Sequence, residues 1–258
     1  MKITFLGTGT STGVPAIGCD CPTCKSTDPR DKRFRSSVLL TFAGRNVLID
    51  TTPDLRMQAL NNQIAKLDAI LFTHSHADHI FGLDDIRRFC LLQNTAIPCY
   101  ASQKCAADIR RIFDYALVEN AHLQSSFCPL IDLHEVSQPF ELFGQPVQPI
   151  PLIHAGEPIL GYRLGSFAYC TDCSQIPPAS LALLSGLDVL VLGALRTRPH
   201  PAHLSISQAV QIAQKLAPLR TFFIHFGHSV SHQATSRELP ENIFLAHDGL
   251  CIETDQDQ

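Results

Sequence analysis

The sequence lacks an apolar run long enough to cross a membrane. None of its hydrophobic stretches approaches the roughly 18–20 residues that a transmembrane helix needs. The beginning of the chain, Met1–Gly7, is too short in apolar length, and too soon interrupted by glycine, to serve as a secretory signal. We therefore expect a cytoplasmic protein with no membrane partner.

The sequence also lacks an excess of positive charge. Lysine and arginine together number 20 against 24 aspartates and glutamates, so the formal net charge is -4 with neutral histidines. Proteins that coat nucleic acid or anionic lipid carry the opposite balance. We therefore expect a small-molecule substrate and do not expect nucleic acid as a partner.

No internal repeat and no linker interrupts the 258 residues. Hydrophobic residues at 45% and charged residues at 17% are typical of a globular protein with a sizeable core. We predict a single domain over residues 1–258. A glycine-rich loop, Gly7–Gly13, follows a predicted strand, Ile3–Leu6, but it lacks the lysine of a phosphate-binding P-loop and is weak evidence for a nucleotide site.

Cysteine, by contrast, is plentiful. The chain has ten cysteines and no export signal, which favours thiols and metal ligands over a disulfide framework. Cys19, Cys21 and Cys24 form a C-x-C-x2-C cluster at residues 19–24 that could converge on one zinc ion. A structural zinc needs four ligands, so the fourth must come from far along the chain. The alternative is three free thiols in a loop.

The densest group of ligand-type side chains lies between His74 and His79, which reads H-S-H-A-D-H. An apolar run of strand length, Leu67–Thr73, precedes it. Alternate residues of an extended chain point the same way, so His74 and His76 can hold one ion, while Asp78 and His79 can face a second. Imidazole and carboxylate ligands suit zinc, manganese or iron. A histidine-rich surface turn is the alternative.

Three later residues, His154, Asp172 and His225, also stand where a predicted strand ends. Those strands are Pro146–Ile153, Phe167–Cys170 and Arg220–Ile224. Asp50 likewise ends a predicted strand, where it is either a carboxylate that orients a metal-bound histidine or an ordinary turn residue.

The rest of the pattern mixes helices and strands. We predict a hairpin from Ser37–Phe42 and Asn46–Asp50. The predicted helices are Asp54–Gln63 with Asp54 as a possible cap, Leu83–Gln93, Gln103–Glu119, and Ile206–Leu216 capped by Ser205. Periodicity alone therefore predicts only a mixed α and β chain.

The H-x-H-x-D-H spacing resembles the signature of the metallo-β-lactamase superfamily. The wider pattern resembles the PhnP-like cyclic phosphodiesterases within it. That pattern consists of C-x-C-x2-C, H-x-H-x-D-H, His154 before Gly161-Tyr162, Thr171-Asp172 and a late H-x2-H, and it covers nearly the whole chain. The resemblance implies an α+β fold, the αββα four-layer sandwich, with two sheets face to face and helices outside.

The resemblance also implies the role of each candidate residue. One catalytic metal ion would be held by His74, His76, His154 and Asp172, and a second by Asp78, His79, His225 and the same Asp172. A structural zinc would be held by Cys19, Cys21, Cys24 and His228. His203 would act as the general acid, and Asp78 counts with it among the catalytic residues.

The implied activity is that of a dinuclear phosphoric diester hydrolase with two zinc or manganese ions and one structural zinc. Its substrate would be a small, cyclic phosphodiester such as a ribose cyclic phosphate or cyclic nucleotide, attacked by a hydroxide that bridges the ions. Arg196 or Arg198 would neutralise phosphoryl oxygens, and a homodimer is a possible assembly.

Four alternatives stay open at this stage. A pyrroloquinoline-quinone biosynthesis B-like protein shares the cysteine loop, and glyoxalase-type thioesterases share only the metal ligands. A tRNA 3′-processing endonuclease would need a basic arm that the sequence does not show. A zinc-binding regulatory protein could keep the fold without catalysis.

Overall fold

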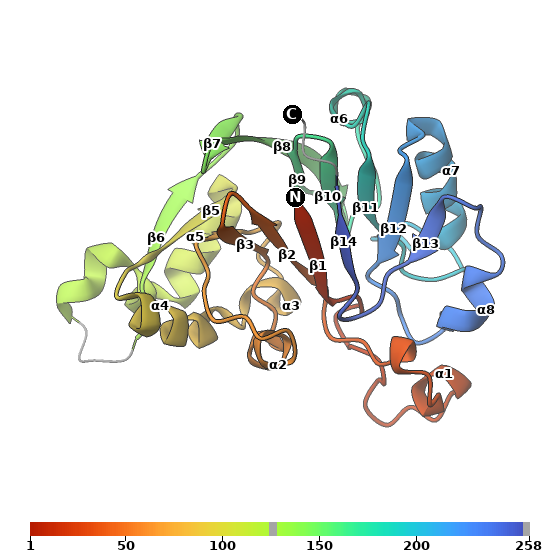
Figure 1. Cartoon of the computed structure of the whole chain (residues 1–258), viewed down its shortest axis with the longest axis horizontal. Coiled ribbons are helices and arrows are strands. Elements are labelled where there is room, and N and C mark those ends of the chain that lie inside the picture. Colours follow the sequence, from red (N-terminus) through yellow and green to blue (C-terminus); the bar gives the residue numbers. More distant parts are fainter. Residues whose placement is uncertain (124–127, 255–258) are drawn as a thin grey trace.

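The computed structural model describes residues 1–123 and 128–254. Within them, the chain forms two seven-stranded sheets that pack face to face (Figure 1). The first sheet has the order β14-β1-β2-β3-β4-β5-β6. Its strands are β1 (Lys2–Gly7), β2 (Ser37–Phe42), β3 (Arg45–Ile49), β4 (Ala69–Leu71), β5 (Ile97–Ala101), β6 (Ile131–Glu135) and β14 (Cys251–Glu253).

The second sheet has the order β13-β12-β11-β10-β9-β8-β7. Its strands are β7 (Phe140–Leu142), β8 (Gln145–His154), β9 (Glu157–Leu164), β10 (Phe167–Cys170), β11 (Val189–Gly193), β12 (Arg220–Ile224) and β13 (Ile243–Leu245).

Helices cover the outer faces of both sheets (Figure 1). Beside the first sheet lie α2 (Leu55–Asn61), α3 (Ala77–Ile80), α4 (Arg87–Gln93) and α5 (Gln103–Ile112), with 3-10 turns η2 (Leu83–Ile86), η3 (Asp114–Ala116) and η4 (Val118–Leu123). Beside the second lie α6 (Pro178–Leu183), α7 (Ile206–Leu216) and α8 (His232–Ser236). A loop with α1 (Pro22–Lys25) and η1 (Pro29–Asp31) projects near α8 (Figure 1).

The side chains of each strand alternate between the core that the two sheets share and the core under the helices. Phe222 of β12 packs in the core between the sheets, whereas its neighbour Phe223 packs in the core beneath α7. Ile70 and Leu71 of β4 divide in the same way between the helix-covered core and the inter-sheet core. Successive side chains of a strand face opposite sides, so strands covered on both faces must be apolar at nearly every position. The predicted αββα sandwich is confirmed.

Parallel pairing brings strand ends to shared edges. β3 to β6 run parallel in the first sheet, and β10 to β13 run parallel in the second. The carboxyl ends of neighbouring parallel strands lie together. The loops after β3 and β4, and those after β10 and β12, can therefore present their side chains to a common space.

The two ends of the described chain also lie together. β1 pairs with β14 through the register Lys2 to Glu253, and the Met1 amine donates a hydrogen bond to the Thr254 carbonyl oxygen at 3.2 Å. The last four residues, Asp255–Gln258, lie outside the described residues.

Several local predictions are confirmed. The hairpin of β2 and β3 forms with the turn at Ala43 and Gly44. Ser205 caps α7 in a full capping box: its hydroxyl accepts from the Gln208 backbone N–H, and the Gln208 side chain accepts from the Ser205 backbone N–H.

Two predictions about helices are wrong. Asp54 precedes α2, but its carboxylate accepts hydrogen bonds from the backbone and guanidinium of Arg35 and does not cap the helix. The helix expected to reach Glu119 ends at Ile112, because Phe113 leaves helical geometry and short 3-10 turns follow.

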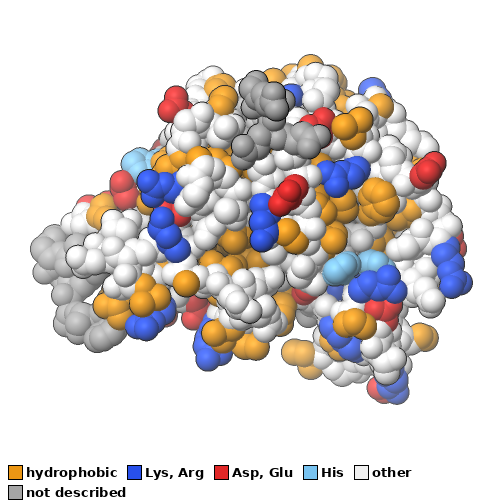
Figure 2. All heavy atoms as spheres, viewed as in Figure 1, with side chains coloured by type: hydrophobic (Ala, Val, Ile, Leu, Met, Phe, Trp, Pro, Cys, Tyr) orange, Lys and Arg blue, Asp and Glu red, His pale blue; other side chains and the backbone are white. Residues whose placement is uncertain are grey.

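The surface drawn in Figure 2 carries lysine and arginine side chains scattered among acidic and uncharged ones, without a continuous basic belt on that face. No helix among the described residues is both long and apolar enough to cross a membrane.

Candidate metal centre

The candidate ligands lie directly after strands, in turns with unusual backbone geometry. Asp50 follows β3, Asp172 follows β10 and His225 follows β12, and all three have left-handed backbones with φ of 64°, 56° and 63°. This conformation is costly for residues other than glycine and persists where the surrounding structure enforces it, often at functional sites. The turns bring Asp172 and His225 together with the other candidate ligands, and they place Asp50 against His79.

His74, His76 and His154 form a first imidazole group. Their ligand atoms lie within 4.8 Å of one another, with His74 Nε2 3.1 Å from His76 Nδ1. The Nδ1 atom of His154 donates to the Ala202 carbonyl oxygen at 2.8 Å, and a neutral ring bonded in this way leaves Nε2 as an electron-pair donor. Three imidazole rings this close together suit a divalent ion.

Asp78, His79, Asp172 and His225 form a second group, again with ligand atoms within 4.8 Å. His79 Nε2 lies 3.4 Å from carboxylate oxygens of both Asp78 and Asp172, and His225 Nδ1 lies 3.1 Å from Asp172 Oδ1. Both of these ring nitrogens are buried without a hydrogen-bond partner among the described residues. Buried polar atoms normally have partners, so these two nitrogens fit a bound cation.

Asp172 lies between the two groups. Besides its contacts in the second group, its carboxylate forms a further cluster within 4.8 Å with His154 and His203. Its side chain is 3% exposed. Its carboxylate therefore lies against His79 and His225 of the second group and His154 of the first.

Asp50 fixes the orientation of the His79 ring by a hydrogen bond to its Nδ1 atom. Its Oδ2 atom accepts a hydrogen bond from His79 Nδ1 at 2.7 Å, and its two oxygens also accept from the backbone and hydroxyl of Thr73 at 2.8 Å. This leaves His79 Nε2 facing the second group. Of the two interpretations of Asp50, the structure therefore favours the carboxylate that orients a ligand.

Electrostatics prepare these side chains for a cation. Burial, together with neighbouring imidazoles, lowers the pKa of His74 well below its usual value. Burial alone would raise the pKa of Asp172, but the rings of His225 and His79 hold it well below its usual range. For His79, the carboxylates of Asp172, Asp78 and Asp50 outweigh burial and raise the pKa, so this position favours positive charge, and a metal ion that binds there would displace the ring proton. Neutral imidazoles and ionised carboxylates are the forms that bind divalent metals.

His203 stands beside the ligands without belonging to either strand-end group. Its ring stacks on His225 with centroids 4.9 Å apart, and its Nδ1 atom lies 4.0 Å from Asp172 Oδ2. The side chain is 15% exposed, so a substrate can reach it. Burial, and then the adjacent His225, lowers the pKa of His203 to about 3.

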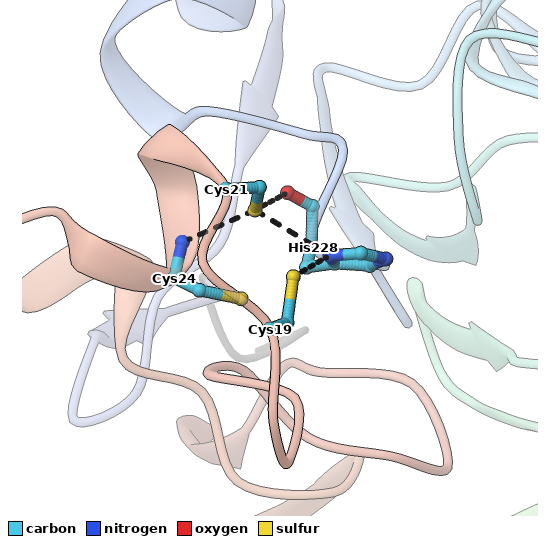
Figure 3. Close-up of side chains that lie close together, drawn as sticks. All are labelled: Cys19, Cys21, Cys24 and His228. Carbon is cyan, nitrogen blue, oxygen red and sulfur yellow. Dashed lines mark hydrogen bonds between the residues drawn. The ribbon is translucent and has the colours of Figure 1, made fainter.

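The cysteine cluster and His228 form a separate site (Figure 3). The Sγ atoms of Cys19 and Cys21 lie 3.1 and 3.4 Å from His228 Nδ1, and all four ligand atoms lie within 4.8 Å. The Cys24 backbone N–H donates to Cys21 Sγ and is the main cause that lowers the pKa of Cys21 to about 6. Burial raises the pKa of Cys24 to about 11. The structure thus brings together the three cysteines and the expected fourth ligand in a set that suits zinc.

Thr10 is a site residue that the sequence did not reveal. Its hydroxyl lies 3.1 Å from His225 Nε2, which leaves His225 Nδ1 toward Asp172. The glycine-rich loop makes this possible, because Gly9 pairs with Phe226 and a β-carbon there would meet Arg33 at 3.0 Å. Nothing in a G-x-G-x sequence indicates such a contact. The loop serves close backbone packing at this point.

The fold and this ligand arrangement define a metallohydrolase of the metallo-β-lactamase fold. Residues 45–226 match the family described as "Beta-lactamase superfamily domain". A crystal structure described as a new diphosphatase from the PhnP family is 46% identical, covers 98% of both chains and superposes with a TM-score of 0.91. The chain therefore belongs to the PhnP family of this superfamily.

More distant relatives show the fold alone. Zn(2+)-bound PqqB from Methylobacterium extorquens is 19% identical, with 98% of this chain and 100% of that chain covered and a TM-score of 0.81. The short form of human tRNase Z is 20% identical, with 98% and 99% covered and a TM-score of 0.73.

A curated relative is longer than this chain. A Porphyromonas gingivalis protein named octanoyltransferase is 39% identical over 255 residues, which are 97% of this chain and 51% of that protein. The chain thus spans about half the length of this relative.

Proposed function

We propose that the chain is a dinuclear phosphodiesterase that hydrolyses a small, preferentially cyclic, phosphodiester. The observation that carries this proposal is the placement of Asp172, whose buried carboxylate lies against His79 and His225 of the second group and against His154 of the first. His74, His76, His154 and Asp172 would hold one divalent ion, and Asp78, His79, His225 and Asp172 the other. When bound, the two ions would supply an activated water and electrophilic stabilisation of phosphoryl oxygens.

The chain's own residues orient the ligands and supply the proton. Asp50 and Thr10 fix the ring orientations of His79 and His225, so the ligands are preorganised. His203 lies within reach of the site and would deliver a proton to the departing oxygen. A negative phosphoryl group beside its ring would favour the protonated form, which opposes the lowering of its pKa by burial.

Metal content and turnover together test this function. The metal-loaded chain should bind two ions in addition to the ion of the cysteine cluster, and it should hydrolyse bis-p-nitrophenyl phosphate and a nucleoside 2′,3′-cyclic phosphate. Asp172→Ala should abolish turnover and lower the affinity of the chain for both catalytic ions. A single catalytic ion in metal-replete protein, or no hydrolysis of any diester with zinc or manganese, would refute the proposal.

Cleavage of a diphosphate bond is the second candidate. The similar PhnP-family structure is described as a diphosphatase. In this chain, a cavity of about 500 Å³ that includes Arg196 and Arg198 adjoins Thr10 beside the catalytic ligands, which favours a substrate with more than one negative charge. Turnover of a dinucleoside diphosphate at a higher rate than a cyclic diester would select this candidate.

Acyl transfer, which the name of the longer relative suggests, is not our proposal. The candidate centre consists of imidazoles and carboxylates, and the nearby Cys173 is buried with its pKa raised to about 12. A thiol in that state is a poor nucleophile.

A further inference from the structure

The segment that carries the first two ligands of the metal centre has little backbone support of its own. His74, Ser75 and His76 lie between the end of β4 and the start of α3 and belong to no helix or strand. Within the described part of the chain, no backbone hydrogen bond engages the N–H or the carbonyl oxygen of Ser75. The two histidines are its direct neighbours in the chain, so the positions of both imidazoles depend on what holds Ser75.

Ser75 is held through its side chain. Its hydroxyl donates to Asp108 Oδ2 at 2.7 Å, and the bond joins residues 33 positions apart in the sequence. This bond is the main cause that lowers the pKa of Asp108, so the carboxylate is ionised at neutral pH. A hydrogen bond to an ionised acceptor is shorter and stronger than one between neutral groups. The segment between the two histidines is therefore attached to α5 by a strong side-chain contact.

The helix α5 gives Asp108 a fixed base. Ser102 caps the start of this helix, and Ile109, which follows Asp108, is completely buried in the helix-covered core. The other carboxylate oxygen, Oδ1, accepts from Arg111 at 3.2 Å, but the Arg111 side chain is 72% exposed. Ion pairs at exposed positions contribute little. The bond to Ser75 is thus the contact through which Asp108 acts on the rest of the molecule.

His76 is the ligand that depends most on this support. Its side chain is exposed, and its Nδ1 atom lies 3.1 Å from Nε2 of His74, which is itself a candidate ligand. Within the described residues, no group outside the imidazole ligands forms a hydrogen bond with the His76 ring. The other ligand rings each have such a partner: His74 has Thr73, His79 has Asp50, His225 has Thr10 and His154 has the Ala202 carbonyl oxygen. The place of the His76 ring is therefore set by its backbone.

We propose that Asp108 is a positioning residue for the metal centre, which fixes the segment between His74 and His76 through the Ser75 hydroxyl so that both rings reach the same ion. The proposal rests on the proposed function, since it assumes an ion bound by these two rings and His154. Asp108 belongs to none of the candidate ligand clusters and acts only through Ser75. The H-x-H-x-D-H pattern leaves the residue between its first two histidines open, and in this chain that residue has a task of its own.

Zinc affinities of single and double variants of the full chain test the proposal. Competition with a chelator should show that Asp108→Ala lowers the affinity for one catalytic ion roughly 10- to 100-fold, as for other groups that orient metal ligands. Ser75→Ala should cause the same loss. The double variant should bind no more weakly than either single variant, because both changes remove the same bond. Ser75→Thr keeps the hydroxyl and should retain most of the affinity of the unmodified chain.

Arg111→Gln is the matched control, because it removes the other partner of Asp108 and leaves the bond to Ser75 in place. It should leave zinc affinity unchanged, and every variant should keep the ion of the cysteine cluster. Unchanged affinity in Asp108→Ala, losses that add in the double variant, or an equal loss in Arg111→Gln would overturn the proposal. Failure of the proposed function would appear differently, as absence of diester turnover by the unmodified, metal-loaded chain whatever the affinities of the variants are.

Discussion

Asp50 controls the geometry of His79 from a position that is completely buried. Its Oδ2 atom accepts from His79 Nδ1, and Thr73 donates to both of its oxygens. The two partners share one carboxylate, so loss of its charge affects the ligand ring and the strand end together. The residue has no direct contact with the space between the two ligand groups and acts through His79.

We expect Asp50→Asn to lower catalytic metal affinity by roughly 10- to 100-fold, the usual effect of removing a partner of a ligating histidine. Titration with a competing chelator measures the metal affinity of each variant. Asp188→Asn is the control, because that carboxylate accepts from Ser166 at the opposite end of β11. Equal metal affinity in Asp50→Asn and the unmodified chain would contradict the role of Asp50.

His203→Ala should lower turnover by roughly 10²–10⁴-fold and leave metal content unchanged, because His203 would move a proton without holding an ion. The loss should be smaller for bis-p-nitrophenyl phosphate, whose leaving group needs little protonation, than for a cyclic diester with an alkoxide leaving group. Steady-state rates for both substrates measure the difference. Equal losses for the two substrates, or loss of metal, would argue against the acid role.

At the residue scale, the sequence could predict the candidate ligands because their types and spacing are themselves the signal. His74 to His79 fit within six residues, and His154, Asp172 and His225 each follow an apolar run. Thr10 and Thr73 could not be predicted in this way. Thr10 lies against His225 and Thr73 donates to Asp50, and both contacts join segments that are far apart in the sequence.

At the element scale, one short loop joins both metal-ligand sets. His225 faces Asp172, and His228, three residues later, faces the cysteine cluster. The buried guanidinium of Arg33 donates to the Val230 carbonyl oxygen at 2.8 Å and ties this loop to the segment after η1. A zinc at the cysteine cluster would therefore hold the loop of His225 without touching substrate.

We expect Cys21→Ser to lower the melting temperature and to remove about one zinc per chain while the catalytic ions stay bound at saturating metal. The core is large, so partial loosening is expected, and the chain should still fold. Metal analysis and thermal unfolding measure both effects. Cys251→Ser is the control, since Cys251 is an exposed free thiol outside the cluster. Unchanged zinc content and melting temperature in Cys21→Ser would mean that the three cysteines are free thiols.

Long, strongly patterned elements were predictable from sequence, and short or polar ones were not. The capped helix α7 and the β2–β3 hairpin carry local signals of their own. The three-residue strands β7, β13 and β14 lie at or near sheet edges, where partners supplied by the fold define them. The early end of α5 has the same cause, because the turn at Phe113 packs its ring into the helix-covered core.

At the scale of the whole molecule, the candidate metal centre draws ligands from both sheets. His74 follows β4 of the first sheet, whereas His154, Asp172 and His225 belong to strand ends of the second. Ions bound there would connect the two halves of the sandwich. They would also neutralise carboxylates that are buried together.

Removal of metal by a chelator should therefore lower the melting temperature, and added zinc or manganese should restore it in a concentration-dependent way. Magnesium, which prefers oxygen ligands, should restore less at the same concentration. Scanning calorimetry of the Cys21→Ser chain would isolate the contribution of the catalytic ions. A melting temperature independent of all three metals would contradict a centre that links the sheets.

The pairing of β1 with β14 gives the chain a nearly closed path. Met1 and Thr254 are hydrogen-bonded neighbours, and the exposed turn at Ala43 and Gly44 lies between two paired strands. A circular permutant, in which a short peptide joins the ends beyond Met1 and Thr254 and new ends open at that turn, would keep every strand beside its present neighbours. Such a rearranged chain should fold with both ligand sets intact, although its order of synthesis would begin with β3 and finish with β2.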